Sequence, residues 1–587
     1  MDDDSKKKRF LIQHPITSKS KLSLLISLFI FIIFLVFHGD SPMASKTFKP
    51  VLTIHPLSHL AIQNSNSEGL QRIRVVDRIV FPDHVLLLIS KNDHALFSSY
   101  RILSEVNCVY RIKEKLSGSG DEVIDLGMLS VDEYNELEAI VRCPSPPANY
   151  SAAVDLYRRS NAMRRVDKEN GLMSESVHSW DGLVYGAVLD GSSTAAVFVK
   201  GLNLRADRAS DCSQFSCHFG WGDSERSTKY VLTTKAITAA QEVIRCRLPR
   251  SLQILPGKAN GVRVTIEDSF RRQHHRHLPS VAKLIKPVNR KERRNREKHE
   301  LCVCTMVWNQ AGALKEWIAY HAWLGVERWF IYDNNSDDNI KDVIDELDQE
   351  NYNVSRHVWP WIKTQEAGFS HCALQAKNEC KWVGFFDVDE YFYFPPPTAH
   401  HPASLVSPGR NSLQSVVAKF SDSTTIGEIR TTCHSFGPSG LTTIPPRGLT
   451  VGYTCRLQRP ERHKSIIRPD ALDDTLLTVV HHFHLKPGYK YMNLPQSAAI
   501  INHYKYQVWE SFRAKFYRRV ATYVADWQEN QNEGSNDRAP GLGTEAIEPP
   551  NWSRQFCEVW DTGLRDFIVA NLADPDSGLL PWERSLS

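Results

Sequence analysis

The sequence predicts an α/β domain with a mainly parallel sheet and helices on both faces, preceded by an all-β sandwich region and one N-terminal transmembrane helix. Three observations predict this order: an uncharged apolar run over residues 22–37, short β-type runs over residues 71–270, and alternating strand-like and helix-like runs after residue 300. At 587 residues the chain is too long for one ordinary core. Its net charge of +4 argues against a nucleic-acid binder, whose domains carry a concentrated basic excess.

The apolar run decides the expected compartment. It reads LSLLISLFIFIIFLVF and contains no charge or helix breaker. It is short for a spanning helix, which usually needs ~20 residues, so a cleaved signal peptide is the alternative. A retained anchor is favoured because the run exceeds the usual signal core and no small-x-small cleavage site follows directly. The preceding lysines and arginine hold the N-terminus in the cytosol. We therefore expect a single-pass type II protein of the Golgi membrane, with the remainder of the chain lumenal.

Changes in composition and periodicity divide the chain into seven expected regions. These are a cytosolic tail (1–21), the transmembrane anchor (22–37), a stem (38–70), one or two β-sandwich modules (71–270), a basic linker (271–299), the α/β domain (300–527), and a polar loop with a C-terminal helix (528–587). The linker contains the run RRQHHRH from residue 271 to 277. A solvated helical linker is the simpler interpretation of this charge, and a patch for acidic polysaccharide or phospholipid is the alternative.

Cysteine spacing indicates a repeat within the β region. Cys108 is followed by an I-V-R-C unit that ends in Cys143, and Cys217 by a V-I-R-C unit that ends in Cys246. This pattern predicts two β modules, each with one cross-sheet disulfide, and one continuous β domain is the alternative. Cys212 has no assigned partner. The twelve cysteines fit an oxidising lumen, and four glycosylation sequons fit it too: Asn149, Asn334, Asn353 and Asn551.

Polar residues follow the predicted strands of the α/β domain. Asn309, Asp333 and Asp387 each come where an apolar strand-like run ends. In such sheets ligands bind outside the carboxyl ends of the strands, so we expect these three residues to lie at one edge. Asp333 is a candidate for binding a uracil or ribose group, and an Asx-turn or helix N-cap is the alternative.

Asp387 and Asp389 form the strongest candidate metal site. Two carboxylates two residues apart, just past a buried strand, can reach one hard divalent cation such as Mn²⁺ or Mg²⁺. A surface turn rich in acids is the alternative interpretation. Three late histidines are candidates for a further ligand: His503, with His482 and His484 as alternatives. His482 and His484 alternate on a strand-like run, so they are expected to face the same side.

Other charged residues are candidates for phosphate binding and proton transfer. Lys464 is a candidate for holding diphosphate oxygens, with ordinary salt bridging as the equal alternative. Candidate general bases are Asp470, Asp474 and Glu461, with Asp473 beside them; no spacing singles out one of them.

Ordered motifs across residues 301–520 resemble glycosyltransferase family 92, whose plant members include the β-1,4-galactan synthases. The matching segments are CVCTMVWN (302–309), LKEWIAYH (314–321), LGV (324–326), YDNNSDD (332–338), FDVDEY (386–391), KSI (464–466) and NHYK (502–505). The resemblance implies a GT-A type domain, an inverting reaction, a UDP-sugar donor (galactose most often) and Mn²⁺. It also implies that Asp387 and Asp389 hold the metal, with His503 as the late ligand.

The expected activity is therefore transfer of a sugar from a UDP-sugar to a cell-wall polysaccharide or glycan acceptor in the Golgi lumen. Asn309, Asp333 and Lys464 are expected to bind the donor. Expected partners are the donor, the acceptor and the membrane, with a homodimer as a further expectation and no nucleic acid. A non-catalytic carbohydrate-binding membrane protein is the alternative. A nucleotide-dependent phosphotransferase is disfavoured because no G-x-x-x-x-G-K-[ST] loop is present.

Overall fold

The computed structural model describes residues 70–91, 106–112, 123–159, 176–222, 228–254, 256–269, 277–287, 297–397, 405–479, 481–523 and 548–584. The predicted cytosolic tail and transmembrane anchor, and all of the predicted stem before residue 70, lie outside these residues. Within them, no helix is both long and apolar enough to cross a membrane.

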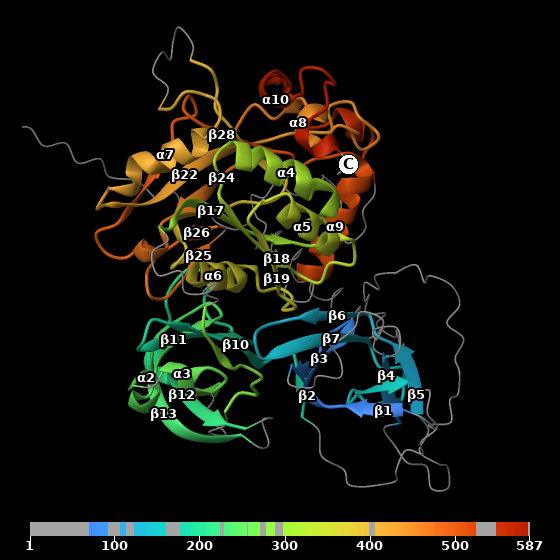
Figure 1. Cartoon of the computed structure of the whole chain (residues 1–587), viewed down its shortest axis with the longest axis vertical. Coiled ribbons are helices and arrows are strands. Elements are labelled where there is room, and N and C mark those ends of the chain that lie inside the picture. Colours follow the sequence, from blue (N-terminus) through green and yellow to red (C-terminus); the bar gives the residue numbers. More distant parts are fainter. Residues whose placement is uncertain are drawn as a thin grey trace, which may run out of the picture. The chain divides into compact units, whose positions relative to one another are not determined.

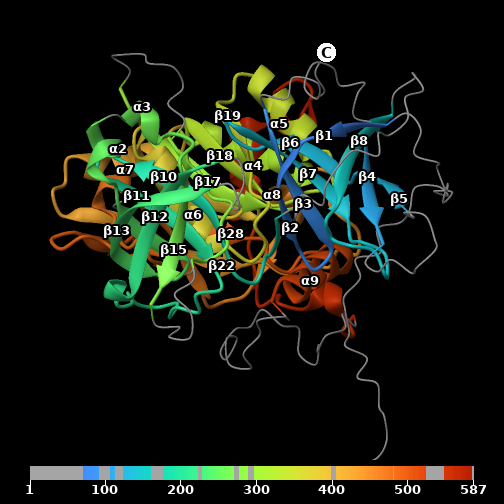
Figure 2. The ribbon, with the colours of Figure 1, turned by 90° about the horizontal axis from the view of Figure 1, so that it is seen from below.

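The first β unit consists of two sheets. The four-stranded sheet has the order β1 (Leu70–Ile73), β8 (Asp155–Arg159), β4 (Val106–Arg111) and β5 (Val123–Gly127); the five-stranded sheet has the order β6 (Ser130–Glu133), β7 (Glu138–Pro144), β3 (His84–Ser90), β2 (Val75–Val80) and β9 (Val177–Ser179). Figure 2 shows these strands in blue and cyan. The Cys108–Cys143 disulfide joins β4 to β7 and so connects the two sheets.

Strand β3 is apolar on both faces because both are buried. Val85 and Leu87 pack with Cys108 in the core of the first β unit, whereas Leu86 and Leu88 belong to a second cluster that includes residues of the α/β domain. The continuous run of apolar residues in this strand is therefore explained by two cores and not by one.

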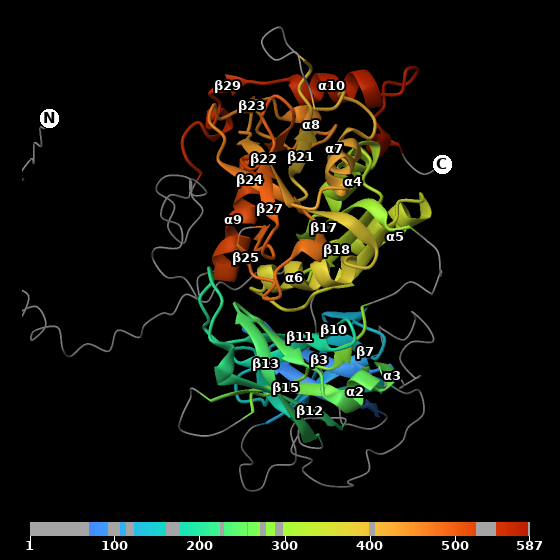
Figure 3. The same cartoon turned by 90° about the vertical axis from the view of Figure 1, so that its left-hand side faces the viewer.

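The second β unit is one seven-stranded sheet. Its order is β15 (Arg263–Asp268), β12 (Phe215–Trp221), β13 (Lys229–Ala240), β14 (Val243–Arg247), β11 (Thr194–Lys200), β10 (Leu183–Asp190) and β16 (Leu284–Ile285) (Figure 3). Three short helices accompany it: η2 (Cys212–Gln214), α2 (Arg250–Ile254) and α3 (Pro256–Ala259). The Cys217–Cys246 disulfide joins β12 to β14. Both predicted cysteine pairs are confirmed. The second joins strands that are not neighbours, because β13 pairs with β12 through its first half and with β14 through its second half, and Cys217 and Cys246 meet in the core between them. Cys212 is free.

The sheet of the α/β domain is mixed. Its nine strands run in the order β19 (Val354–Val358), β18 (Arg328–Asp333), β17 (His299–Val307), β20 (Cys380–Phe385), β24 (Arg462–Ile467), β22 (Ile426–Ser435), β28 (Ile500–His503) and β21 (Glu390–Tyr393), with β27 (Lys490–Asn493) paired to β22. The first four strands are parallel. Strand β24 is antiparallel to both β20 and β22, and β21 is antiparallel to β28. Seven of the nine strands therefore run in one direction, so the sheet is mainly parallel as predicted, with two reversed strands.

Helices cover both faces of this sheet, as predicted. On one face α4 (Ala311–Trp323), α5 (Ile340–Gln349) and α7 (Ser412–Ser421) share a core with Leu301 and Val303 of β17. On the other face α6 (Gln365–Ala376) packs near Cys302 and Cys304 of the same strand. Figure 1 shows β17 and β18 between α4 and α6.

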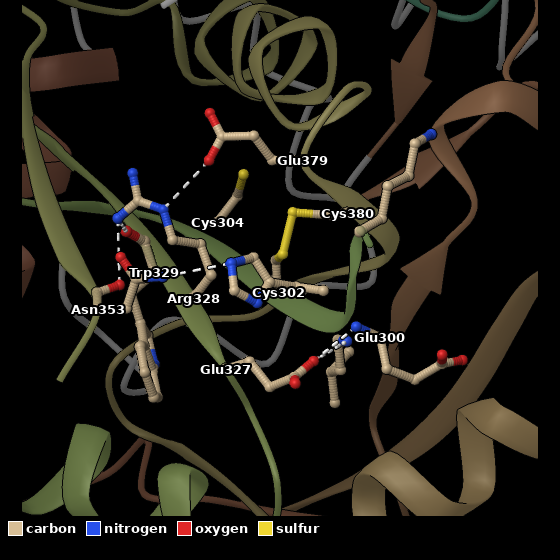
Figure 4. The surroundings of a disulfide bond; sticks show 12 residues. Glu300, Cys302, Cys304, Glu327, Arg328, Trp329, Asn353, Glu379 and Cys380 are labelled. Carbon is tan, nitrogen blue, oxygen red and sulfur yellow. Dashed lines mark hydrogen bonds and ion pairs between the residues drawn. A yellow bond between two sulfur atoms is a disulfide. The ribbon is translucent and has the colours of Figure 1, made fainter. Parts of the chain in front are cut away.

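Three disulfides hold the α/β domain together. Cys302–Cys380 joins the neighbouring strands β17 and β20, and Cys304–Cys372 joins β17 to α6. Figure 4 shows the first of these, with Arg328 paired to Glu379 nearby. The third, Cys455–Cys557, ties the C-terminal segment to the domain.

The C-terminal segment packs on the α/β core. Helix α10 (Gly563–Leu572) contributes Leu564, Ile568 and Leu572 to the same cluster as α4. The remaining short elements of the domain are α8 (Leu449–Gly452), β23 (Cys455–Arg456) paired with β29 (Val559–Trp560), η3 (Pro469–Ala471), β25 (Thr478–Val479) paired with β26 (His482–Phe483), α9 (Trp509–Tyr523), η5 (Trp552–Arg554) and η6 (Pro581–Glu583).

Candidate active site

Three acids follow one buried strand at the edge of the sheet. Strand β20 ends at Phe385, Asp387 and Asp389 lie in the turn beyond it, and Glu390 begins β21. The turn is closed by the backbone N–H of Glu390, which donates to the carbonyl of Asp387 at 3.0 Å. The Asp387 N–H donates in return to the Glu390 carboxylate at 2.9 Å. The acids are therefore held as one fixed group at the carboxyl end of β20.

A buried lysine balances two of these acids. Lys464 Nζ, on β24, lies 2.7 Å from Asp387 Oδ2 and 3.0 Å from Glu390 Oε1, and it donates to His481 Nε2 at 2.8 Å. Burial by itself would lower the pKa of Lys464, but the charges of Asp387 and Glu390 raise it above its usual value. Burial lowers the pKa of His481 to about 3, so this ring is neutral and can accept that hydrogen bond.

Asp389 has a separate set of basic partners. Lys515 of α9 forms an ion pair with its carboxylate, and His503 Nε2 lies 3.5 Å from Asp389 Oδ2. The other ring nitrogen of His503 lies 3.6 Å from Glu390 Oε1, because the two residues are register partners in β28 and β21. Burial opposes ionisation of Asp389, but Lys515 and His503 hold its pKa well below the usual range.

Asp389, Glu390 and His503 fit a divalent cation. One ligand atom from each can be chosen so that all lie within 4.8 Å of one another. Two carboxylates and one imidazole are a donor set that suits Mn²⁺. Of the predicted metal ligands, Asp389 and His503 belong to this cluster, whereas the Asp387 carboxylate is held by Lys464. Glu390 was missed, although it directly follows the D-V-D motif.

The two alternative histidines lie away from this cluster. The run around them is not one strand, because β25 and β26 form a hairpin with His481 in its turn at φ 71°. His482 Nδ1 lies 2.9 Å from Glu428 Oε1, and His484 is exposed. Phe483 between them is buried, which agrees with the prediction that His482 and His484 face the same side. The turn directs His481 toward Asp387, at 3.8 Å.

Asn309 and Asp333 organise the loops beside the acids. Asn309 adopts φ 50° and its side-chain oxygen accepts from the Asp337 N–H at 2.8 Å. Asp333 is 1% exposed; its Oδ1 accepts from the Ser336 N–H at 3.0 Å, and its Oδ2 accepts from Arg356 Nε at 2.8 Å. Both oxygens of Asp333 therefore bind the protein, which is the turn-forming role that the sequence left open.

Two arginines, one from the α/β domain and one from the first β unit, link this loop to the first β unit. Arg356 of β19 lies 2.6 Å from Asp132 of β6 as well as binding Asp333. Arg142 of β7 lies 3.0 Å from Asp337. The loop at residues 333–338 is therefore connected by ion pairs to a β unit that is distant in sequence.

The candidate bases are divided between the two edges of the sheet. Because β24 is antiparallel to β20, its first residues lie beside Asp387 and its last residues lie at the opposite edge. Asp470, Asp473 and Asp474 follow that far end; Asp473 and Asp474 line a small cavity with Asp190 and Arg245 of the second β unit. The structure thus places these three residues at the edge of the sheet opposite the acids. Glu461 precedes β24 at the near edge, where Lys505 Nζ lies 3.0 Å from it.

Comparison with known proteins identifies the family. The model of glycosyltransferase family 92 matches residues 297–549. A glycosyltransferase family 92 protein of Ricinus communis is 54% identical over the full length of both chains. One of Arabidopsis thaliana is 53% identical over 92% of this chain and 90% of its own, and one of rice is 42% identical over 93% and 91%. Among solved structures, Staphylococcus aureus TarS aligns with 39% of this chain and 67% of its own at 13% identity and a TM-score of 0.23. The chain belongs to glycosyltransferase family 92 and is a glycosyltransferase.

Proposed function

We propose that this enzyme transfers a sugar, galactose, from a UDP-sugar to a cell-wall polysaccharide or glycan acceptor with inversion and with a divalent metal. The proposal includes a Golgi lumenal location, a type II membrane anchor and a homodimer. The observation that carries the metal and donor is the cluster of Asp389, Glu390 and His503 beside Asp387, where the parallel strands end. Ten of the twelve cysteines form disulfides, which supports an oxidising compartment.

Basic residues around the acids suit a diphosphate. A cation held by Asp389, Glu390 and His503 would neutralise the charge that develops on the departing nucleoside diphosphate. Lys464 already lies against Asp387, and Lys515 against Asp389, so two ammonium groups border the acids that follow β20. When a diphosphate enters, its oxygens can take hydrogen bonds that these lysines now give to the carboxylates.

Glu461 is our choice for the general base. An inverting transfer needs one base, which removes the proton from the acceptor hydroxyl. The oxygen of that hydroxyl then bonds to the anomeric carbon of the donor sugar, while the bond from this carbon to the diphosphate breaks. Glu461 lies at the same edge as the acids, and the Ser435 hydroxyl and Lys505 both contact its carboxylate. Ser435 is the register partner of His503, which places Glu461 near the metal cluster.

The test uses the purified full chain with a panel of UDP-sugars, galactan and other glycan acceptors, and Mn²⁺ or Mg²⁺. We expect release of UDP that is greatest with UDP-galactose, is abolished by a chelator, and yields a product of inverted anomeric configuration by NMR. Asp389→Asn should abolish release, whereas the matched control Asp473→Asn at the opposite edge should retain it. Release that survives Asp389→Asn would contradict the proposed site. Failure to consume any UDP-sugar would favour the non-catalytic carbohydrate-binding alternative.

A further inference from the structure

A second group of metal-binding side chains lies in the second β unit, outside the candidate active site. His218 of β12, Glu267 of β15 and His277 each offer one ligand atom, and these atoms all lie within 4.8 Å of one another. His277 ends the basic RRQHHRH run, which the proposed catalytic function does not use.

Strand register places these side chains on one face of the sheet. Glu267 is paired with Ser216, two residues before His218, and His277 forms a β-bridge with Glu267. Cys217 and Phe219, which alternate with His218 along β12, point into the core instead. The face that carries His218 is therefore the outer face. His218 is nevertheless only 8% exposed.

The contacts of His218 direct one ring nitrogen toward the other two ligands. Its Nδ1 lies 3.0 Å from the Thr233 hydroxyl, and its Nε2 lies 2.9 Å from Glu267 Oε2. The His277 ring lies beside the His218 ring, with centroids 4.2 Å apart, and Tyr230 packs edge-on against His277 at 5.5 Å. Two imidazoles and a carboxylate thus converge, and a hydroxyl orients the buried ring as outer partners of metal ligands do.

We propose that His218, Glu267 and His277 form a zinc site that is separate from the catalytic metal. Two imidazole nitrogens and one carboxylate oxygen, with water in the fourth position, are a known ligand set for Zn²⁺. Imidazole ligands favour Zn²⁺ over Mn²⁺ and Mg²⁺, which prefer oxygen. The ion would join β12, β15 and the segment that continues into β16, and so stabilise the second β unit.

The experiment measures metal binding and thermal unfolding of the purified full chain after chelation and dialysis. In calorimetric titration the wild type should bind one molar equivalent of Zn²⁺ at this site. His277→Ala and Glu267→Gln should each lose that binding or weaken its affinity at least tenfold. Zn²⁺ should also raise the Tm of the wild type more than that of either variant. His277 is only partly buried and does not belong to the core cluster of this unit, so its replacement leaves the core intact.

An active-site variant separates this site from the catalytic one. His503→Ala should still bind the molar equivalent of Zn²⁺ that His277→Ala no longer binds. His277→Ala should keep Mn²⁺-dependent UDP release. The proposal is overturned if Zn²⁺ fails to bind, if both β-unit variants bind Zn²⁺ as the wild type does, or if His503→Ala removes all Zn²⁺ binding. In each of those cases the contact between His218 and Glu267 is an ordinary hydrogen bond without a metal.

Discussion

Replacement of Arg356 by methionine should destabilise the loop that follows β18. Arg356 lies 2.7 Å from Asp333 and 2.6 Å from Asp132, and it is the basic group that faces the buried Asp333 carboxylate. Methionine fills much of the volume of the arginine stem but carries no charge. Asp333 would then keep its hydrogen bond from the Ser336 N–H and lose its ion pair.

The expected cost follows from burial. Removing one partner of a buried ion pair costs about 3–5 kcal/mol, because the remaining charge is left uncompensated. The matched control is Lys381→Met, which removes a pair with Glu300 of similar length, 2.8 Å, whose lysine side chain is 47% exposed. Exposed pairs contribute about 0–1 kcal/mol, so this control should have little effect.

The assay compares urea unfolding midpoints and hydrogen exchange of residues 333–338 in the full chain. Arg356→Met should lower the midpoint, speed exchange in this loop and raise KM for the UDP-sugar more than it lowers kcat. Adding Asp333→Asn to this variant should recover part of the lost stability, because the unpaired charge is removed. The reasoning is refuted if Arg356→Met costs no more than Lys381→Met, or if the double variant shows no recovery.

Three further predictions concern the general base, the buried His357 and the lysine beside Asp389. Glu461→Gln should lower kcat roughly 10²- to 10⁴-fold in the UDP-release assay, whereas Asp470→Asn should leave it unchanged; equal losses would reject Glu461. Burial lowers the pKa of His357 to about 3, below its unfolded value of about 6.5, so its contribution to stability is complete above pH ~6.5 and is lost as pH falls toward 3. His357→Phe should therefore flatten the acid dependence of the free energy of unfolding, measured by urea titration, by about 1.4 kcal/mol per pH unit, and an unchanged slope would contradict this. Lys515→Met should tighten Mn²⁺ binding in calorimetry roughly tenfold, about 1.4 kcal/mol, because Lys515 competes for Asp389; weaker binding would be the opposite result.

The sequence predicts the edge of the sheet well, because that edge depends on local order. Apolar runs followed at once by Asn309, Asp333 and Asp387 identify the ends of β17, β18 and the turn after β20. The paired cysteines of the β units are also predictable from their repeat. In each case the signal lies within a few residues of the structure that it predicts.

The errors arise where distant segments pair. The direction of β24 depends on its pairing with β20, about eighty residues earlier in the chain, and this direction alone decides that Asp470 lies far from Asp387 while Lys464 lies beside it. The hairpin at His481 has no glycine or proline to mark it, so a turn reads as a strand. Nothing in the sequence distinguishes Lys515 from other lysines of surface helices, and only the fold shows that it pairs with Asp389.

The central claim is that Asp389, Glu390 and His503 hold one divalent cation beside the donor diphosphate. Anomalous diffraction from crystals of the protein with Mn²⁺ and UDP tests this most directly. We predict one manganese peak in contact with Asp389 and His503 and with the UDP diphosphate. A manganese peak elsewhere, or bound UDP with Lys515 still paired to Asp389 and no metal between them, would contradict the account.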